Sequence, residues 1–215
     1  IDFTYGFSLT EGIIKTKNDI IYTQIKEAPN GLVAAIEINA QAFNNLEKYN
    51  RTLSGRTGCG LCGVDKLEQA VRPLEKIASK FKVKAQQVHK SMQSIKSHQH
   101  LNKETGALHA AAFVNDKGQF IAVREDVGRH NALDKLIGHL MRKKIDPTKG
   151  YTLITSRCSF EMVQKCAIAG IPVITAVSAT TGLAIDLANQ AGISIIAFAR
   201  KGSMNIVTDT ENRII

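Results

Sequence analysis

The fold is decided by residues 151–198, YTLITSRCSFEMVQKCAIAGIPVITAVSATTGLAIDLANQAGISIIAF. Three short, continuous apolar runs in this stretch predict strands: Tyr151–Ile154, Pro172–Val177 and Ile193–Phe198. The amphipathic segments between them predict helices over Phe160–Ala169 and Leu183–Gln190, followed by Gly170 and Gly192 as helix C-caps. Strands that alternate with helices in this way indicate an α/β fold, with a mixed, partly parallel sheet and helices on both of its faces.

The preceding residues continue the same pattern. Residues 131–142 predict a helix. A β-hairpin is predicted from two apolar runs, His109–Val114 and Phe120–Val123, because the turn-forming residues Asn115–Gly118 separate them. Two more helices are predicted further upstream. One covers Leu67–Ser79 with a break or kink at Pro73, and the other begins near Ala85 and carries Val88, Met92 and Ile95 on one side.

Length and composition are those of a single globular domain. The chain has 215 residues, of which 44% are hydrophobic and 22% are charged. Four cysteines are too few for a disulfide scaffold of this size, so we expect reduced thiols and a cytoplasmic location. No apolar run approaches the roughly 18–20 residues that a membrane span needs, and no membrane association is expected.

The positive charge is concentrated in one part of the sequence. The net charge is +9, and residues 51–100 hold 10 Lys and Arg against 3 Asp and Glu, or +7. Such a segment attracts anions, although its lysines also fit ordinary solvated helix faces. Aromatic residues make up only 6% of the chain, which argues against binding of single-stranded nucleic acid by base stacking.

Three loops are predicted to meet at one edge of the sheet. They are Glu125–Asn131, Ser156–Ser159 and Ser178–Gly182, and each precedes a predicted helix. Ligands of open α/β sheets bind beyond the carboxyl ends of the strands, and free N–H groups at helix N-termini favour phosphates there. The candidate ligand contacts in these loops are Arg129, His130, Ser159, Thr180 and Thr181. The alternative is that the hydroxyl residues serve only as helix N-caps.

A glycine-rich cysteine pair lies outside this α/β pattern, in the segment 54–63, SGRTGCGLCG. Two thiols spaced C-x-x-C can ligate a metal, exchange disulfides, or accept and pass on sulfur. A structural zinc site needs two further ligands, whereas Cys158 and Cys166 lie about a hundred residues away and resemble core residues. Sulfur transfer therefore fits best, with Arg56 and the basic segment available to stabilise a thiolate.

Zinc-dependent deamination is a further possibility, which the residues disfavour. The segment His109-Ala110-Ala111 resembles the H-x-E of zinc deaminases, but alanine stands where the catalytic glutamate belongs. The C-x-x-C also precedes the histidine instead of following it. Deaminase activity is therefore not expected, even if the fold is related.

Together, these residues resemble the FdhD family, the sulfur carrier proteins required for formate dehydrogenase activity. The resemblance runs in order through the whole chain, and its most specific part is the block EDVGRHNALDK at 125–135. The other matching segments are 2–3, 6–7, 11–14, 58–63, 108–111, 124, 159, 161–163, 171–173 and 198–200.

The resemblance implies a cytidine-deaminase-like fold, a homodimer and a cytoplasmic location. It also implies that sulfur is received from a cysteine desulfurase and passed to the molybdenum cofactor in its bis-molybdopterin guanine dinucleotide form, for use by formate dehydrogenase. By the motif, Cys59 matches the persulfide-bearing cysteine and Cys62 its partner. The family's cofactor-binding segment follows the final strand, and it falls on Phe198, Ala199, Arg200, Lys201, Gly202 and Ser203.

Two departures from the family pattern accompany this resemblance. Ser203 stands where an arginine is common, which removes one phosphate contact. Family members usually begin some tens of residues earlier, so residues 1–215 are expected to form a single sulfur carrier domain that lacks the N-terminal part of the pattern. We therefore expect a sulfurtransferase with no tightly held metal. The alternative is a non-catalytic chaperone of formate dehydrogenase maturation that binds zinc or a nucleotide.

Overall fold

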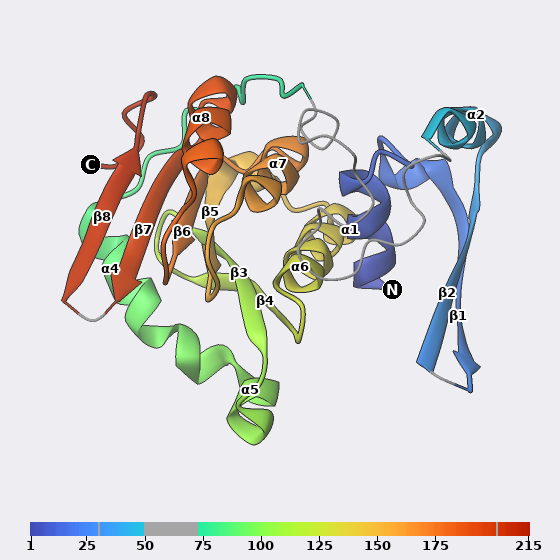
Figure 1. The fold of residues 1–215 in the computed structure, drawn as a ribbon, viewed down its shortest axis with the longest axis horizontal. Coiled ribbons are helices and arrows are strands. Elements are labelled where there is room, and N and C mark those ends of the chain that lie inside the picture. Colours follow the sequence, from blue (N-terminus) through green and yellow to red (C-terminus); the bar gives the residue numbers. More distant parts are fainter. Residues whose placement is uncertain (30, 50–72, 201) are drawn as a thin grey trace.

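The computed structural model describes residues 1–29, 31–49, 73–200 and 202–215, and it has the expected mixed α/β architecture (Figure 1). The strands are β1 (Ile20–Ala28), β2 (Gly31–Ile38), β3 (His109–Asn115), β4 (Phe120–Asp126), β5 (Gly150–Ile154), β6 (Val173–Ala176), β7 (Ser194–Arg200) and β8 (Ser203–Thr208). The α-helices are α1 (Asp2–Thr10), α2 (Ala40–Tyr49), α4 (Ala85–Ser94), α5 (His100–Thr105), α6 (Arg129–Lys143), α7 (Phe160–Ala169) and α8 (Gly182–Ala191). Short 3₁₀ turns cover Lys17–Asp19, Ile95–His98 and Pro147–Lys149.

The main sheet has six strands in the order β4-β3-β5-β6-β7-β8. Strands β5, β6 and β7 are parallel, and β3 and β8 pair antiparallel with β5 and β7. Because β4 pairs antiparallel with β3, it runs in the same direction as β5. The carboxyl ends of β4, β5, β6 and β7 therefore all lie at one edge of the sheet, which we call the carboxyl edge.

Successive residues of the strands pack on opposite faces of this sheet. Ile154 and Ile174 lie in a core built with α6, α7 and α8, whereas Leu153 and Val173 lie in a second core that includes Val88 of α4. Helices therefore cover both faces, as the continuous apolar character of the strands predicts.

Most of the elements predicted from residue 85 onward are confirmed. The hairpin is β3–β4, the helix near Ala85 is α4, and α7 has the predicted bounds with Gly170 at φ +80° as its C-cap. The helix predicted over Leu67–Ser79 is wrong in its described part, since residues 73–79 have no helical structure. Here the Ile77 N–H donates to the Ala191 carbonyl oxygen at 2.9 Å, and Arg213 donates to the Ser79 carbonyl oxygen at the same distance.

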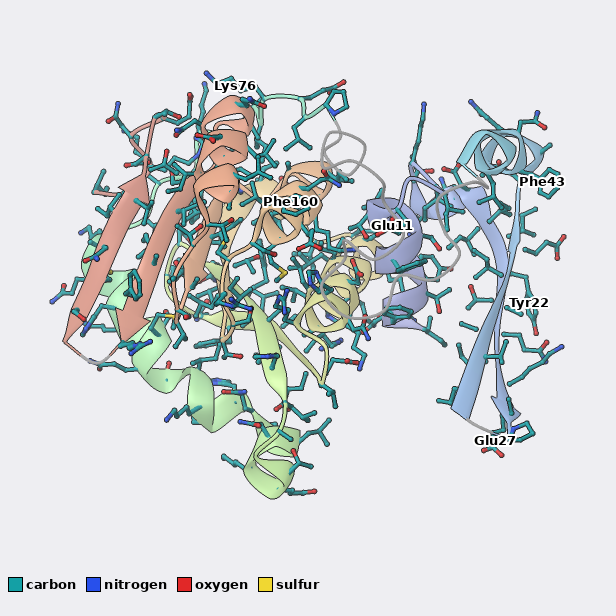
Figure 2. All side chains as sticks on the ribbon, in the orientation of Figure 1. Glu11, Tyr22, Glu27, Phe43, Lys76 and Phe160 are labelled. Atoms are coloured by element: carbon teal, nitrogen blue, oxygen red, sulfur yellow. The ribbon has the colours of Figure 1, made fainter. Side chains whose placement is uncertain are left out.

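Residues 1–29 and 31–49 form elements that the sequence patterns did not predict. Helix α1 packs on α6, and β1 and β2 form a separate two-stranded sheet that stands beside α1 (Figure 1). Tyr22 of β1 and Phe43 of α2 are more than half exposed and point away from the main sheet (Figure 2). Among the described helices, none is long and apolar enough to cross a membrane.

Candidate functional site

The carboxyl edge gathers the three loops that the sequence assigned to an anionic ligand. The loop after β4 leads into α6, the loop after β5 into α7, and the loop after β6 into α8. The N-termini of three helices of 10 to 15 residues therefore lie at this edge, with their positive dipole ends. Residue His109, the first of β3, lies at the same edge because β3 runs opposite to β4.

Two of these loops are bonded directly to each other. The Cys158 N–H donates to the Ala179 carbonyl oxygen at 3.0 Å, and the Thr181 N–H donates to the Cys158 carbonyl oxygen at 3.2 Å. The Thr180 hydroxyl donates to the same Cys158 oxygen at 3.1 Å. The starts of α7 and α8 are thereby fixed relative to each other before any ligand binds.

The N-cap alternative explains only part of the hydroxyl content of these loops. The Thr181 side chain accepts the Ala184 N–H at 3.3 Å and is a helix cap. Ser159 is the N-cap residue of α7, but its hydroxyl donates to the Glu161 carboxylate at 2.8 Å. The Thr180 hydroxyl is bonded to Cys158 as described, so capping accounts for one of these three side chains.

Arg129 and His130 form the first turn of α6, where no side chain caps the helix. The Asp126 carboxylate shapes the approach to this helix, because it accepts the Gly128 N–H at 2.8 Å and pairs with Lys135 at 2.6 Å. Arg129 Nε and His130 Nε2 are buried and have no hydrogen-bond partner within the described part of the chain. His130 Nε2 lies 3.9 Å from a Glu161 oxygen, beyond hydrogen-bond distance.

The electrostatics at the start of α6 favour an anion. Burial, followed by the positive charges of Arg129 and Lys165, lowers the pKa of His130 to about 4. Burial and the Arg129 charge also hold the pKa of His109 below its usual value. Both imidazoles are therefore neutral at neutral pH, and the Arg129 guanidinium supplies the positive charge that a phosphate requires.

A buried ionic cluster lies next to this turn, and sequence reasoning missed its role. Lys165 of α7 donates to both Asp134 oxygens at 2.8 and 2.9 Å and to the Thr10 hydroxyl at 2.9 Å. It also lies 3.4 Å from Glu11, at the end of α1 that faces α7 (Figure 2). Burial raises the pKa of Asp134, and the Lys165 ammonium opposes that shift. The cluster joins α1, α6 and α7, and no spacing in the sequence indicates it.

The predicted cofactor segment is located differently from expectation. The resemblance implies that this segment, 198–203, follows the final strand, but Phe198–Arg200 belong to β7 and Ser203 begins β8, so the described residues of the segment lie in these strands and at Gly202, in the turn between them. Phe198 is 42% exposed and has a φ of +52°, at a bulge in the β7–β8 pairing. Strand β7 ends at the carboxyl edge, so this turn lies at the same edge as the three loops.

The predicted sulfur-bearing residues Cys59 and Cys62, with Arg56, lie outside the described residues, as does Lys201 of the cofactor segment. The core assignment of the other two cysteines is confirmed. Cys158 and Cys166 are fully buried, and burial raises the pKa of Cys158 to about 12 and that of Cys166 well above its ordinary value. Neither thiol is suited to nucleophilic attack. Within the described ranges, no three His, Cys, Asp or Glu residues are grouped as a metal site would require.

Comparisons with known proteins agree with this architecture. The sequence model of the FdhD/NarQ family matches residues 1–215. "Sulfur carrier protein FdhD" of Bordetella bronchiseptica is 45% identical over 205 residues, which is 95% of this chain and 74% of that protein. The protein of the same name from Agrobacterium fabrum is 42% identical over 216 residues, which is 100% of this chain and 80% of that protein.

A solved structure has the same fold. It is that of "a putative formate dehydrogenase accessory protein from Desulfotalea psychrophila", which superposes with a TM-score of 0.72 at 24% identity. The superposition covers 100% of this chain and 79% of that one. The family match over the full chain and the identity to these relatives lead to one conclusion: this chain belongs to the FdhD/NarQ family.

Proposed function

We propose that this chain is a sulfurtransferase that carries sulfur as a persulfide on Cys59 and delivers it to a molybdenum cofactor used by formate dehydrogenase. Relatives named sulfur carrier protein FdhD support the sulfur-carrying part. The formate dehydrogenase part is supported by the accessory role that the name of the structural neighbour gives to that protein. The observation that carries the proposal is the meeting of the Arg129 turn, two hydroxyl-rich loops and the β7–β8 turn at one edge of the sheet.

Loading requires a thiolate and a sulfur donor. The Cys59 thiolate attacks the outer sulfur of a persulfide on a cysteine desulfurase. A new S–S bond forms on Cys59, the S–S bond of the donor breaks, and the donor cysteine leaves as a thiolate. The +7 charge of residues 51–100 favours the anionic form of the attacking cysteine.

Delivery requires two electrons, because the carried sulfur must leave as sulfide. The Cys62 thiolate attacks the inner sulfur of the Cys59 persulfide, which forms a Cys59–Cys62 disulfide and transfers the outer sulfur as sulfide to the molybdenum of the substrate. A cellular dithiol then reduces the disulfide and restores both thiols. The cofactor is thus a substrate in this scheme, and its guanine nucleotide portion is the part that the carboxyl edge binds.

The contacts proposed for the guanine dinucleotide combine charge and donors. Arg129 supplies a guanidinium, the starts of α6, α7 and α8 supply N–H groups, and the β7–β8 turn supplies Phe198 and Arg200. Ser159, Thr180, Thr181 and neutral His130 line the same edge. A homodimer and a cytoplasmic location complete the proposal, and they rest on the family resemblance.

Mass spectrometry tests the sulfur step. After incubation with a cysteine desulfurase and cysteine, the wild-type protein should carry one extra sulfur atom on Cys59, and Cys59→Ala should carry none there. Cys62→Ala is the matched variant. It should load sulfur normally but retain it when the cofactor is supplied, because its resolving thiol is absent.

Sulfur acceptance and formate dehydrogenase activation by Cys59→Ala at the wild-type level would overturn the proposal. Stoichiometric zinc held by Cys59 and Cys62 would instead favour a non-catalytic chaperone.

A further inference from the structure

The β7–β8 turn is held from two sides, by the loop that follows β6 and by helix α4, which packs on one face of the sheet. On the first side, the Phe198 N–H donates to the Ser178 carbonyl oxygen at 3.2 Å, and Arg200 Nε donates to the Val177 carbonyl oxygen at 3.1 Å. On the other side, the Gly202 N–H donates to Nε2 of His89 at 3.1 Å. His89 belongs to α4, more than a hundred residues away in the sequence.

Core packing and a hydrogen bond fix the position of helix α4, which carries His89. Val88 is fully buried against the sheet, and Met92 is 7% exposed in the same core. The Tyr151 hydroxyl of β5 donates to the Ser91 hydroxyl of α4 at 2.9 Å. The position of His89 is therefore set by the core, whereas strand β8 lies at the edge of the sheet and has a partner on one side only.

The backbone at Gly202 has a conformation that only glycine adopts readily. Its φ of +89° favours glycine, and a Cβ built there would meet no atom of the described residues within 4 Å. Arg200 and Ser203 are register partners on either side of the turn. The His89 contact is thus the interaction through which α4 fixes the tip of this turn.

The contact also defines the tautomer of the His89 imidazole. A backbone N–H can only donate, so His89 Nε2 must be the unprotonated acceptor, and the ring proton is on Nδ1. The side-chain amide nitrogen of Gln93 lies 3.3 Å from Nδ1. The oxygen and nitrogen of this amide exchange places by a half rotation, and with the oxygen toward the ring Gln93 accepts a hydrogen bond from Nδ1–H, which supports the tautomer that Gly202 needs.

We propose that His89 is a positioning residue for the guanine nucleotide, which it serves by holding the β7–β8 turn in the conformation that receives this ligand. The role rests on the proposed function, because it assumes that the turn is part of the nucleotide site. His89 need not touch the ligand. It acts through Gly202 by ordering the turn in the free protein. The conformational entropy of the turn is then lost on folding, so ligand binding does not incur this cost.

Binding of guanosine diphosphate to the full chain tests this role. His89→Leu keeps the size of the side chain but removes the acceptor, and the affinity should fall about fivefold, which corresponds to one ordinary hydrogen bond. His89→Gln should restore affinity close to wild type, because the glutamine oxygen reaches about as far as Nε2 and accepts the same N–H. Gln86→Leu, an exposed substitution on the same helix, is the control and should bind as wild type.

Hydrogen exchange of the free protein gives a second readout. The amide of Gly202 should exchange faster in His89→Leu and return to the wild-type rate in His89→Gln. The free energy of unfolding should fall by only about 1 kcal/mol in His89→Leu, which is the value of one hydrogen bond, and return to the wild-type value in His89→Gln.

Two results would separate the possible failures. If His89→Leu binds guanosine diphosphate as tightly as wild type, the role of His89 is wrong. The same follows if His89→Gln binds as weakly as His89→Leu. Neither result would affect the proposed nucleotide site. No binding of guanosine diphosphate by the wild type would show that the proposed nucleotide site is wrong, and the positioning role would fall with it.

Discussion

His130 is a basic side chain kept uncharged in a positively charged surrounding. Its ring is 19% exposed, and Arg129 and Lys165 oppose its protonation, so its pKa of about 4 lies well below the ordinary value near 6.5. A neutral imidazole beside the Arg129 guanidinium offers a hydrogen-bonding group without adding charge. At the same time, the low pKa of His130 makes the free energy of unfolding depend on pH.

We predict that His130 makes the protein less stable in mild acid. The unfolded state binds a proton at His130 below about pH 6.5, whereas the folded state binds it only near pH 4. Stability is therefore lost as the pH falls through this window, and the contribution is fully present above it. Between pH 7 and pH 4.5, wild type should lose about 2 kcal/mol more unfolding free energy than His130→Gln.

Denaturant unfolding at the two pH values measures this difference. His109 and His139 also have lowered pKa values, but both residues are present in both proteins, so their contribution cancels. An equal loss of stability in wild type and His130→Gln would show that His130 is protonated normally in the folded state.

The sequence reveals a site residue when the evidence for it lies in the neighbouring residues. Arg129, Ser159 and Thr181 stand directly before or at the start of predicted helices, and the direction of the strands placed them at one edge. Lys165 and Asp134 gave no such signal, because each looks like an ordinary polar residue of an amphipathic helix. Their pairing depends on how α6 and α7 pack, which no short spacing encodes.

At the scale of elements, α1 and α6 approach each other through glycine. A Cβ added at Gly138 of α6 would lie 1.9 Å from the Asp2 carbonyl oxygen, and one added at Gly6 of α1 would lie 1.8 Å from the Asp134 carbonyl oxygen. The contact brings Asp2 within 2.8 Å of Arg124, and it brings Thr10 to Asp134 at the same distance. The two helices are thus joined by a close backbone contact flanked by polar bonds.

We predict that Gly138→Ala destabilises the protein although alanine is the better helix former. Alanine gains about 1 kcal/mol of helix propensity. The added methyl group collides with backbone that cannot move away alone, so α1 must shift from α6, and we expect a net loss of about 2 kcal/mol or more. Gly182→Ala is the matched control. In the described part of the chain no atom lies within 4 Å of its added Cβ, and the stability of this variant should be unchanged or slightly higher.

Denaturant unfolding of both variants gives the comparison. A Gly138→Ala protein as stable as Gly182→Ala would mean that α1 and α6 do not pack as closely as described.

The elements that escaped prediction share a physical cause. Helix α1 has three aromatic residues and a glycine in its first six positions, and its position depends on the Gly138 contact more than on its own helix propensity. Strands β1 and β2 are largely exposed on both faces, so they lack the alternation of apolar and polar residues that marks a half-buried strand. By contrast, β5, β6 and α7 were predicted well because burial dictates their composition.

At the scale of the whole molecule, the topology gathers binding groups from segments far apart in the sequence. The four strands that end at the carboxyl edge, β4, β5, β6 and β7, bring residues 126–131, 156–159, 178–182, 198–200 and 202–203 to this edge, although about 70 residues separate the first segment from the last. The net charge of +9 attracts an anion toward the entire surface. The position at which the anion binds must therefore depend on local geometry. Substitutions at different positions can separate binding at a specific site from attraction by the net charge.

Two substitutions on α6 that remove the same charge should therefore have different effects on nucleotide binding. Arg129→Gln lies at the carboxyl edge, and it should weaken the binding of guanosine diphosphate at least tenfold, because it removes a charged donor whose buried Nε has no partner among the described residues. Lys143→Gln lies at the other end of the same helix and should change the affinity less than twofold.

Hydrogen exchange with and without guanosine diphosphate locates the site at the same time. The nucleotide should protect the four edge segments and leave β1 and β2 unchanged. Equal weakening by the two substitutions would mean that the nucleotide senses only the net charge. Protection confined to the β1–β2 sheet would place the nucleotide away from the carboxyl edge, and with either result Arg129 would lose its proposed role as a phosphate ligand.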